Sequence, residues 1–167
     1  MKINPAKMRA LVQIERAIGH TFADQRLLVR ALTHRSFSGD NNERFEFISD
    51  AVLDYAVAKM LFDAFPKLSE GELSRLRANL VNEAVLAEIA LEMNMGDALF
   101  LGPGELKSGG FNRPSILADA LEAVIGAVYL DAGYDKADQL VRRLFKDVQV
   151  NPQMKAIGKD PKTELQE

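Results

Sequence analysis

The residues of this 167-residue chain that could do chemistry are carboxylates at helical spacing. Each residue of a helix turns by about 100° from the last, which places Glu43, Glu46 and Asp50 on one narrow stripe. Asp54 also falls on this stripe, and spacing alone does not exclude it. The other positions of this segment are almost all apolar, which is typical of a buried helix. Because buried carboxylates are costly unless they are paired or bind a cation, the stripe indicates a candidate metal site.

A second acidic pair, Asp119 and Glu122, lies one helical turn apart within the apolar segment 116–125. Gly126 falls on the same face and would let another helix approach closely. Neither acidic segment has a Lys or Arg four residues further along its face to form an exposed salt bridge. If the two helices pack side by side, four carboxylates converge, and divalent cations are needed to offset their repulsion.

Carboxylate oxygens without sulfur or nitrogen ligands select Mg²⁺, Mn²⁺ or Ca²⁺ rather than zinc. The chain has no cysteine, and its two histidines, His20 and His34, precede both acidic segments. Neither histidine completes the Glu-x-x-His motif of a di-iron helical bundle, so that alternative fails. We also expect no histidine to act as a general base beside the acids.

The elements that must position these acids are helices, because the apolar spacing is helical nearly throughout and no segment alternates with period two. We therefore expect an all-α fold, a helical bundle. The expected helices cover about residues 5–18, 24–32, 43–65, 69–95, 114–133 and 136–148, and the glycine-rich segment 101–110 is expected to be a loop.

The overall charge argues against a nucleic-acid binder. The chain has 21 Lys and Arg against 24 Asp and Glu, a formal net charge of −3, whereas duplex-binding domains are usually basic. No apolar run approaches the roughly 18 residues that span a bilayer, and the N-terminus lacks the apolar region of a signal peptide. We expect a cytoplasmic protein with no membrane partner and no small-molecule cofactor.

Four segments, in order, resemble the ribonuclease III family. They are Ala31–Phe37, the signature-like segment Asn42–Leu53, the loop Leu101–Gly110 and the second acidic motif Ile116–Ala123. The resemblance covers roughly residues 5–150 and is greatest to the bacterial enzymes. It implies a nuclease domain over residues 1–150. Residues 151–167 are expected to be a linker and the first residues of a double-stranded-RNA-binding domain that is cut short, which would explain the missing positive charge.

The resemblance also implies an activity: a Mg²⁺-dependent endonuclease (Mn²⁺ can substitute) that cuts double-stranded RNA. The products would carry a 5′ phosphate and a short 3′ overhang, as in the processing of ribosomal and messenger RNA. The enzyme would be a homodimer whose two domains form a valley for the duplex.

Roles for individual residues follow from the positions that match the family. The metal-binding acids would be Glu46, Asp50, Asp119 and Glu122, of which Asp50 and Glu122 would be catalytic; Glu43 and Glu70 would be supporting acids, and Phe47 would insert into the partner subunit. Asp54 matches no catalytic position and is expected to be a surface or interface charge. The candidates for RNA phosphate contacts, which could equally be solvated surface charges, are Arg75, Arg77, Lys107 and Arg113.

One departure from the family pattern keeps a second function open. The family usually has glycine directly before the aspartate at position 50, and this chain has Ser49. Serine narrows the space beside the acids. The alternative is therefore a catalytically impaired double-stranded-RNA-binding or assembly module of the same fold. Because all four metal-binding acids are present, we favour the nuclease.

Overall fold

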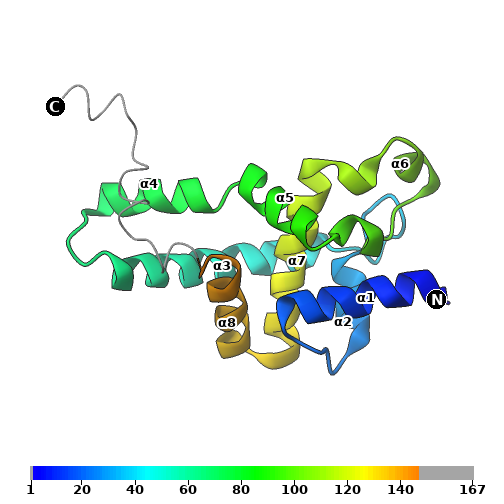
Figure 1. Ribbon diagram of the computed structural model, residues 1–167, viewed down its shortest axis with the longest axis horizontal. Helices are drawn as coiled ribbons and strands as arrows, with labels where there is room; N and C mark the ends of the chain where they lie inside the picture. The colour runs from blue at the N-terminus through cyan, green and yellow to red at the C-terminus, as the bar shows by residue number, and fades with distance from the viewer. Residues whose placement is uncertain (1, 147–167) are drawn as a thin grey trace.

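The protein is built from helices, as its sequence predicts (Figure 1). The computed structural model describes residues 2–146, and these residues include no β-strand, only an isolated bridge between Thr33 and Phe100. The α-helices are α1 (Pro5–Ile18), α2 (Gln25–Ala31), α3 (Glu43–Ala64), α4 (Glu70–Leu80), α5 (Glu83–Glu92), α6 (Pro103–Lys107), α7 (Pro114–Ala132) and α8 (Tyr134–Leu144). Two short 3₁₀ helices, Met95–Ala98 and Gly110–Asn112, lie between α5 and α7.

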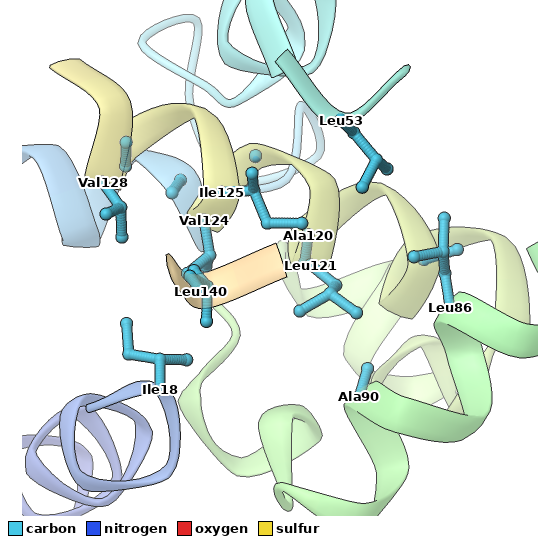
Figure 2. Packing of buried hydrophobic residues seen from close by; sticks show 14 of the residues in the cluster. Ile18, Leu53, Leu86, Ala90, Ala120, Leu121, Val124, Ile125, Val128 and Leu140 are labelled. Carbon is cyan, nitrogen blue, oxygen red and sulfur yellow. The ribbon is translucent and has the colours of Figure 1, made fainter. Parts of the chain in front are cut away.

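Helix α7 is the centre of the core. Its residues from Ile116 to Val128 are almost all buried, as expected of a helix that is apolar on nearly every side. It packs against α3, α5, α8 and α2. Figure 2 shows side chains of α7 such as Leu121 and Val124 among apolar side chains from the surrounding helices, including Leu86 of α5 and Leu140 of α8.

The prediction of one long helix over residues 69–95 is wrong, because the structure divides this segment into α4 and α5. Helix α4 begins with a capping box at Ser69, which the sequence predicts. It ends at Leu80, and the side chain of Asn82 then accepts a 3.0 Å hydrogen bond from the backbone N–H of Val85. This N-cap starts a new helix in a new direction, although the apolar periodicity continues across the break.

The other differences are smaller. The expected loop 101–110 contains the short helix α6, which Pro103 starts at its first turn. Helix α8 begins at Tyr134, two residues before the predicted start. The predicted end of that helix at residue 148 and the predicted linker 151–167 lie outside the described residues.

Helix α3 is not buried on every side, contrary to the prediction. Its aromatic residues Phe47, Tyr55 and Phe62 are exposed, and the exposed fraction of Phe47 is 82%. The second half of α3 forms an antiparallel hairpin with α4 that extends away from α7 (Figure 1). No helix among residues 2–146 combines the length and apolar character that a membrane span needs.

Candidate active site

The close crossing of α3 and α7 positions the acidic residues. A Cβ atom built on Gly126 of α7 would lie 2.6 Å from the carbonyl oxygen of Phe45 and 3.2 Å from the Cβ of Ser49, both in α3. Only glycine fits this contact without a shift of one helix. The two helices therefore pack side by side here, and the first half of α3 lies beside α7.

Glu46 of α3 lies in the electrostatic field of the acids on α7. Its side chain is half-buried, and its pKa is raised from 4.5 to about 7. Burial is the largest cause, and the charges of Asp119, Glu122 and Glu43 add to it, while the charge of Arg35 opposes the shift.

Glu122 has a matching environment on the other side of the crossing. Its side chain is also half-buried, and its pKa is raised from 4.5 to about 7, first by burial and then by the charges of Asp119, Asp50 and Asp54. The structure thus brings carboxylates of α3 and α7 close enough to disfavour one another's ionisation.

The prediction that the acids are buried is correct only in part. Glu46 and Glu122 are half-buried, whereas Glu43, Asp50 and Asp119 are exposed. Neighbouring protein still desolvates Asp119, and its pKa is raised by this desolvation and by the charge of Glu83, against the charges of His34 and Arg35. Of these acids, Glu43, Glu46 and Asp119 line an open cleft, whereas Asp50 and Glu122 are not among its lining residues.

The donor set of this cluster suits a hard divalent cation, because every candidate ligand is a carboxylate oxygen. Within residues 2–146, no three acidic or histidine side chains are arranged so that they could hold a metal ion as they stand. A cation would have to draw the side chains together.

A cleft of about 410 Å³ opens beside the first half of α3 and the start of α7. Its lining contains the acids Glu43, Glu46 and Asp119 together with basic residues. The full lining is His34, Arg35, Asn42, Glu43, Glu46, Glu105, Arg113, Ser115, Ile116 and Asp119. His34 lines the same cleft as Asp119, so a histidine lies near the acids, although the sequence predicts none that acts as a general base there.

The backbone that carries His34 is held by pairing with a segment far along the chain. The N–H of His34 donates to the carbonyl oxygen of Phe100 over 3.0 Å, and the N–H of Phe100 donates to that of Leu32 over 2.9 Å. A Cβ on Gly102 would collide with the carbonyl oxygen of Ser36, so this glycine permits the close approach. The first and third segments of the family resemblance are therefore one structural unit.

The predicted RNA contacts do not share one surface. Arg113 lines the cleft and forms an ion pair with Glu105. Lys107 is exposed at the end of α6. Arg77, with Glu70, lines a separate groove of about 450 Å³ between α3 and α4, and Arg75 is exposed on the same helix. Within one chain, the predicted supporting acid Glu70 is thus apart from the acid cluster, whereas Glu43 lies in it.

Sequence reasoning missed four residues whose charges act on the acids. They are His34, Arg35, Asp54 and Glu83, of which Asp54 is expected from the sequence to be only a surface or interface charge. The helical stripe contains Asp54, so a signal existed for it. The positions of the other three depend on contacts between segments and have no periodic signal.

Two further residues of α3 lie beside the acids. Phe47 is almost fully exposed next to Glu46. Ser49 next to Asp50 is fully buried, and its Oγ has no hydrogen-bond partner among the described residues. Such a buried hydroxyl without a partner is uncommon in a folded protein.

Comparison with known proteins gives a consistent result. The family model described as Ribonuclease-III-like matches residues 24–148. The chain is 58% identical to Ribonuclease 3 of Neisseria gonorrhoeae over all its 167 residues, which cover 70% of that protein. It is 60% identical over 155 residues to Ribonuclease 3 of Thiobacillus denitrificans, covering 93% of this chain and 69% of that protein.

A solved structure is also similar: the nuclease domain of ribonuclease III from Campylobacter jejuni, which has structural flexibility in a region involved in dimer formation. The TM-score is 0.79 at 48% sequence identity, and the match covers 81% of this chain and 95% of that domain.

Proposed function

This chain belongs to the ribonuclease III family and is a ribonuclease, and on that premise we propose that it is a Mg²⁺-dependent endonuclease of double-stranded RNA. The products would carry 5′ phosphates and short 3′ overhangs. The observation that carries the proposal is the raised pKa of Glu46 and of Glu122, each about 7, which is caused first by burial and then by the charges of the other acids on α3 and α7. Carboxylates gathered at such a cost favour a site that binds divalent cations.

The residues that would hold Mg²⁺, or Mn²⁺ in its place, are Glu46, Asp50, Asp119 and Glu122. When bound, the cation would supply Lewis-acid stabilisation of phosphate charge and lower the pKa of a water. The protein's own contribution is to release protons. Because a pKa of about 7 leaves the carboxyl groups of Glu46 and Glu122 partly protonated near neutral pH, these two residues would give up protons when they hold a cation.

The basic residues of the cleft would bind the RNA backbone. Arg35 and Arg113 line the same cleft as Glu46 and Asp119, so a phosphodiester there would have cationic partners close to two of the proposed metal-binding acids. Double-stranded RNA is recognised mainly through its shape, its 2′-hydroxyl groups and its phosphates. Because few basic residues line the cleft, we expect this chain to bind RNA weakly and to lose affinity as the salt concentration rises.

We also propose a homodimer, formed through the exposed face of α3. Phe47, Tyr55 and Phe62 expose large aromatic surfaces along this helix, and exposed apolar surface of this kind is typical of an interface. The similar Campylobacter jejuni domain has a region involved in dimer formation. A second chain packed here would lie next to Glu46. The role that we propose is processing of ribosomal and messenger RNA in the cytoplasm.

The test is cleavage of a short perfect RNA duplex in Mg²⁺ by the wild type and by Asp50→Asn and Glu122→Gln, with EDTA as a control. Each substitution keeps the side-chain size and removes one anionic ligand, and we expect the rate to fall by about 100-fold or more. Glu92→Gln, at an exposed position at the end of α5, should cleave within about twofold of the wild type. Wild-type rates for both ligand variants, or cleavage that persists in EDTA, would overturn the proposal.

The impaired binding module remains the second candidate because of Ser49. Its Oγ is buried without a partner at the crossing beside Asp50. The same assay separates the two functions: a wild-type chain that binds the duplex but cleaves it neither in Mg²⁺ nor in Mn²⁺ is the module. If Ser49→Gly then restores cleavage, Ser49 is the cause of the impairment.

A further inference from the structure

His34 is held in one orientation by Ser36. The backbone N–H of Ser36 donates a 3.1 Å hydrogen bond to Nδ1 of His34, and the Oγ of Ser36 lies 2.8 Å from the same nitrogen. The N–H of Gly102 donates to this Oγ over 2.9 Å, which leaves the hydroxyl hydrogen free to point at Nδ1. The ring is therefore fixed by the turn in which it lies and by the loop that follows Phe100.

These contacts decide which nitrogen carries the proton. Because a backbone N–H points at Nδ1, the neutral ring accepts there and has its proton on Nε2. A protonated ring would also have a proton on Nε2. In either state Nε2–H is a hydrogen-bond donor, so a base role is excluded for this nitrogen.

The Nε2–H donor of His34 is available for a bound substrate. Among the described contacts of His34, no protein group hydrogen-bonds to Nε2, although the residue lines the 410 Å³ cleft. The ring lies close enough to Asp119 for its charge to affect the pKa of that carboxyl group. Arg35 and Arg113 share the lining, so a phosphate in the cleft would meet His34 together with two guanidinium groups.

We propose that the Nε2–H of His34 donates a hydrogen bond to a non-bridging phosphate oxygen of the RNA strand that lies in the cleft. The inference rests on the proposed function, and it assigns His34 as a residue that contacts the substrate. Ser36, Gly102 and the Phe100 pairing fix the donor before the RNA arrives. A fixed donor loses little conformational freedom when it binds, which strengthens the contact.

The test uses two variants that differ in which ring nitrogen they imitate. In His34→Asn, the side-chain oxygen can accept the N–H of the residue two positions on, as in an Asx turn, so the contact with Ser36 is kept. The donor at the Nε2 position is lost. His34→Gln is longer by one methylene and places an amide N–H further into the cleft, where it can replace that donor.

We expect the single-turnover cleavage rate of His34→Asn to fall by about 10- to 100-fold, as for the loss of a hydrogen bond to a charged group. His34→Gln should recover at least about fivefold of this loss. Thermal unfolding of both variants is measured in parallel. If the two variants have equal rates, or if His34→Asn cleaves like the wild type, the proposal is wrong.

Phosphorothioate duplexes give a readout that a purely structural role would not affect. Single Rp or Sp substitutions are placed at the scissile phosphate and at its neighbours, and rates are measured for the wild type and His34→Asn. At the contacted oxygen, sulfur should slow the wild type but have a much smaller effect on the variant, because the contact is already lost. The rate loss caused by sulfur and the rate loss caused by His34→Asn are compared at each position. If the combined loss equals their product within about twofold at every position, His34 only holds the loop. Cleavage of the unmodified duplex by the wild type tests the proposed function separately.

Discussion

Gly126 of α7 lies directly against the carbonyl oxygen of Phe45 in α3, since a Cβ at position 126 would be only 2.6 Å from that oxygen. This contact sets the distance between the helix that carries Glu46 and the helix that carries Glu122. The position of the acid cluster therefore depends on a residue that has no side chain.

Gly126→Ala should destabilise the protein and separate the acids. The methyl group gains up to about 1 kcal/mol of helix propensity, but pushing the helices apart costs about 1–3 kcal/mol, so we expect a net loss. Gly71→Ala is the matched control, because a Cβ there would meet nothing nearer than the Ser69 Oγ at 4.0 Å. Urea unfolding measures both variants. Equal stability changes for the two would mean that the crossing relaxes freely.

Stability should fall as the pH rises through neutrality in cation-free buffer. The pKa of Glu46 and of Glu122 is about 7 in the folded chain against an ordinary value of 4.5. The stability linked to their protonated forms is complete below the ordinary value and is lost as the pH rises through about 7. The melting temperature should therefore decrease as the pH rises from 5 to 8. Added Mg²⁺ should reduce this decrease by neutralising the acid cluster.

The variants Glu46→Gln and Glu122→Gln check the origin of this pH dependence. Each should flatten the curve and should be more stable than the wild type at pH 8, because an amide has no charge to bury. Glu92→Gln should keep the wild-type slope. A slope that neither cluster variant reduces would assign the effect to other groups.

Ser49→Ala should stabilise the protein. The buried Oγ of Ser49 has no partner among the described residues, so removing the hydroxyl ends a desolvation cost of about 1–3 kcal/mol. Part of the gain is helix propensity, and Ser74→Ala at an exposed position of α4 measures that part. Ser49→Gly removes the same hydroxyl but adds about 1 kcal/mol of backbone cost, so it should be less stable than the alanine variant. A loss of stability in Ser49→Ala would show that the hydroxyl has a partner.

Asp131→Ala should lower stability by about 2–3 kcal/mol. The Asp131 carboxylate, with a side chain 4% exposed, is hydrogen-bonded to Nε2 of His20 over 2.8 Å and to the N–H groups of Ala23 and Asp24 over 3.0 Å each. Burial alone would raise its pKa, but these hydrogen bonds outweigh burial and lower it. The carboxylate thus ties the turn after α1 to the end of α7.

The control for this prediction is Asp135→Ala in the first turn of α8, where the side chain is exposed. It should change the free energy of unfolding by no more than about 0.5 kcal/mol. A difference between the two alanine variants smaller than this would mean that the turn finds other partners.

Helical periodicity was sufficient to predict the faces that carry the acids. Glu46 and Asp50 share a stripe, Asp119 and Glu122 share another, and Gly126 marks where the helices touch. The depth of burial was not predictable, because a helical wheel gives the direction of a side chain but not how far the neighbouring helices cover it.

Long-range backbone pairing explains why the position of His34 in the cleft could not be predicted from the sequence. His34 reaches the cleft because Thr33 pairs with Phe100, and nothing in the periodicity of either segment indicates that contact. The break between α4 and α5 had a local signal in Asn82, an N-cap residue followed by Glu83. The continuous apolar pattern outweighed that signal in the prediction.

Helix α4 is expected to unfold locally while the rest of the molecule stays folded. Its main helical partner is α3, with which it forms the hairpin that extends away from α7, and its buried side chains are Leu76 and Leu80 alone. Few buried contacts make a segment a separate unit of local unfolding. Amide hydrogens of α4 should therefore exchange with solvent through local openings that leave α7 protected. The α3–α4 groove that contains Glu70 and Arg77 would be lost and regained in each of these openings, many times for every unfolding of the core.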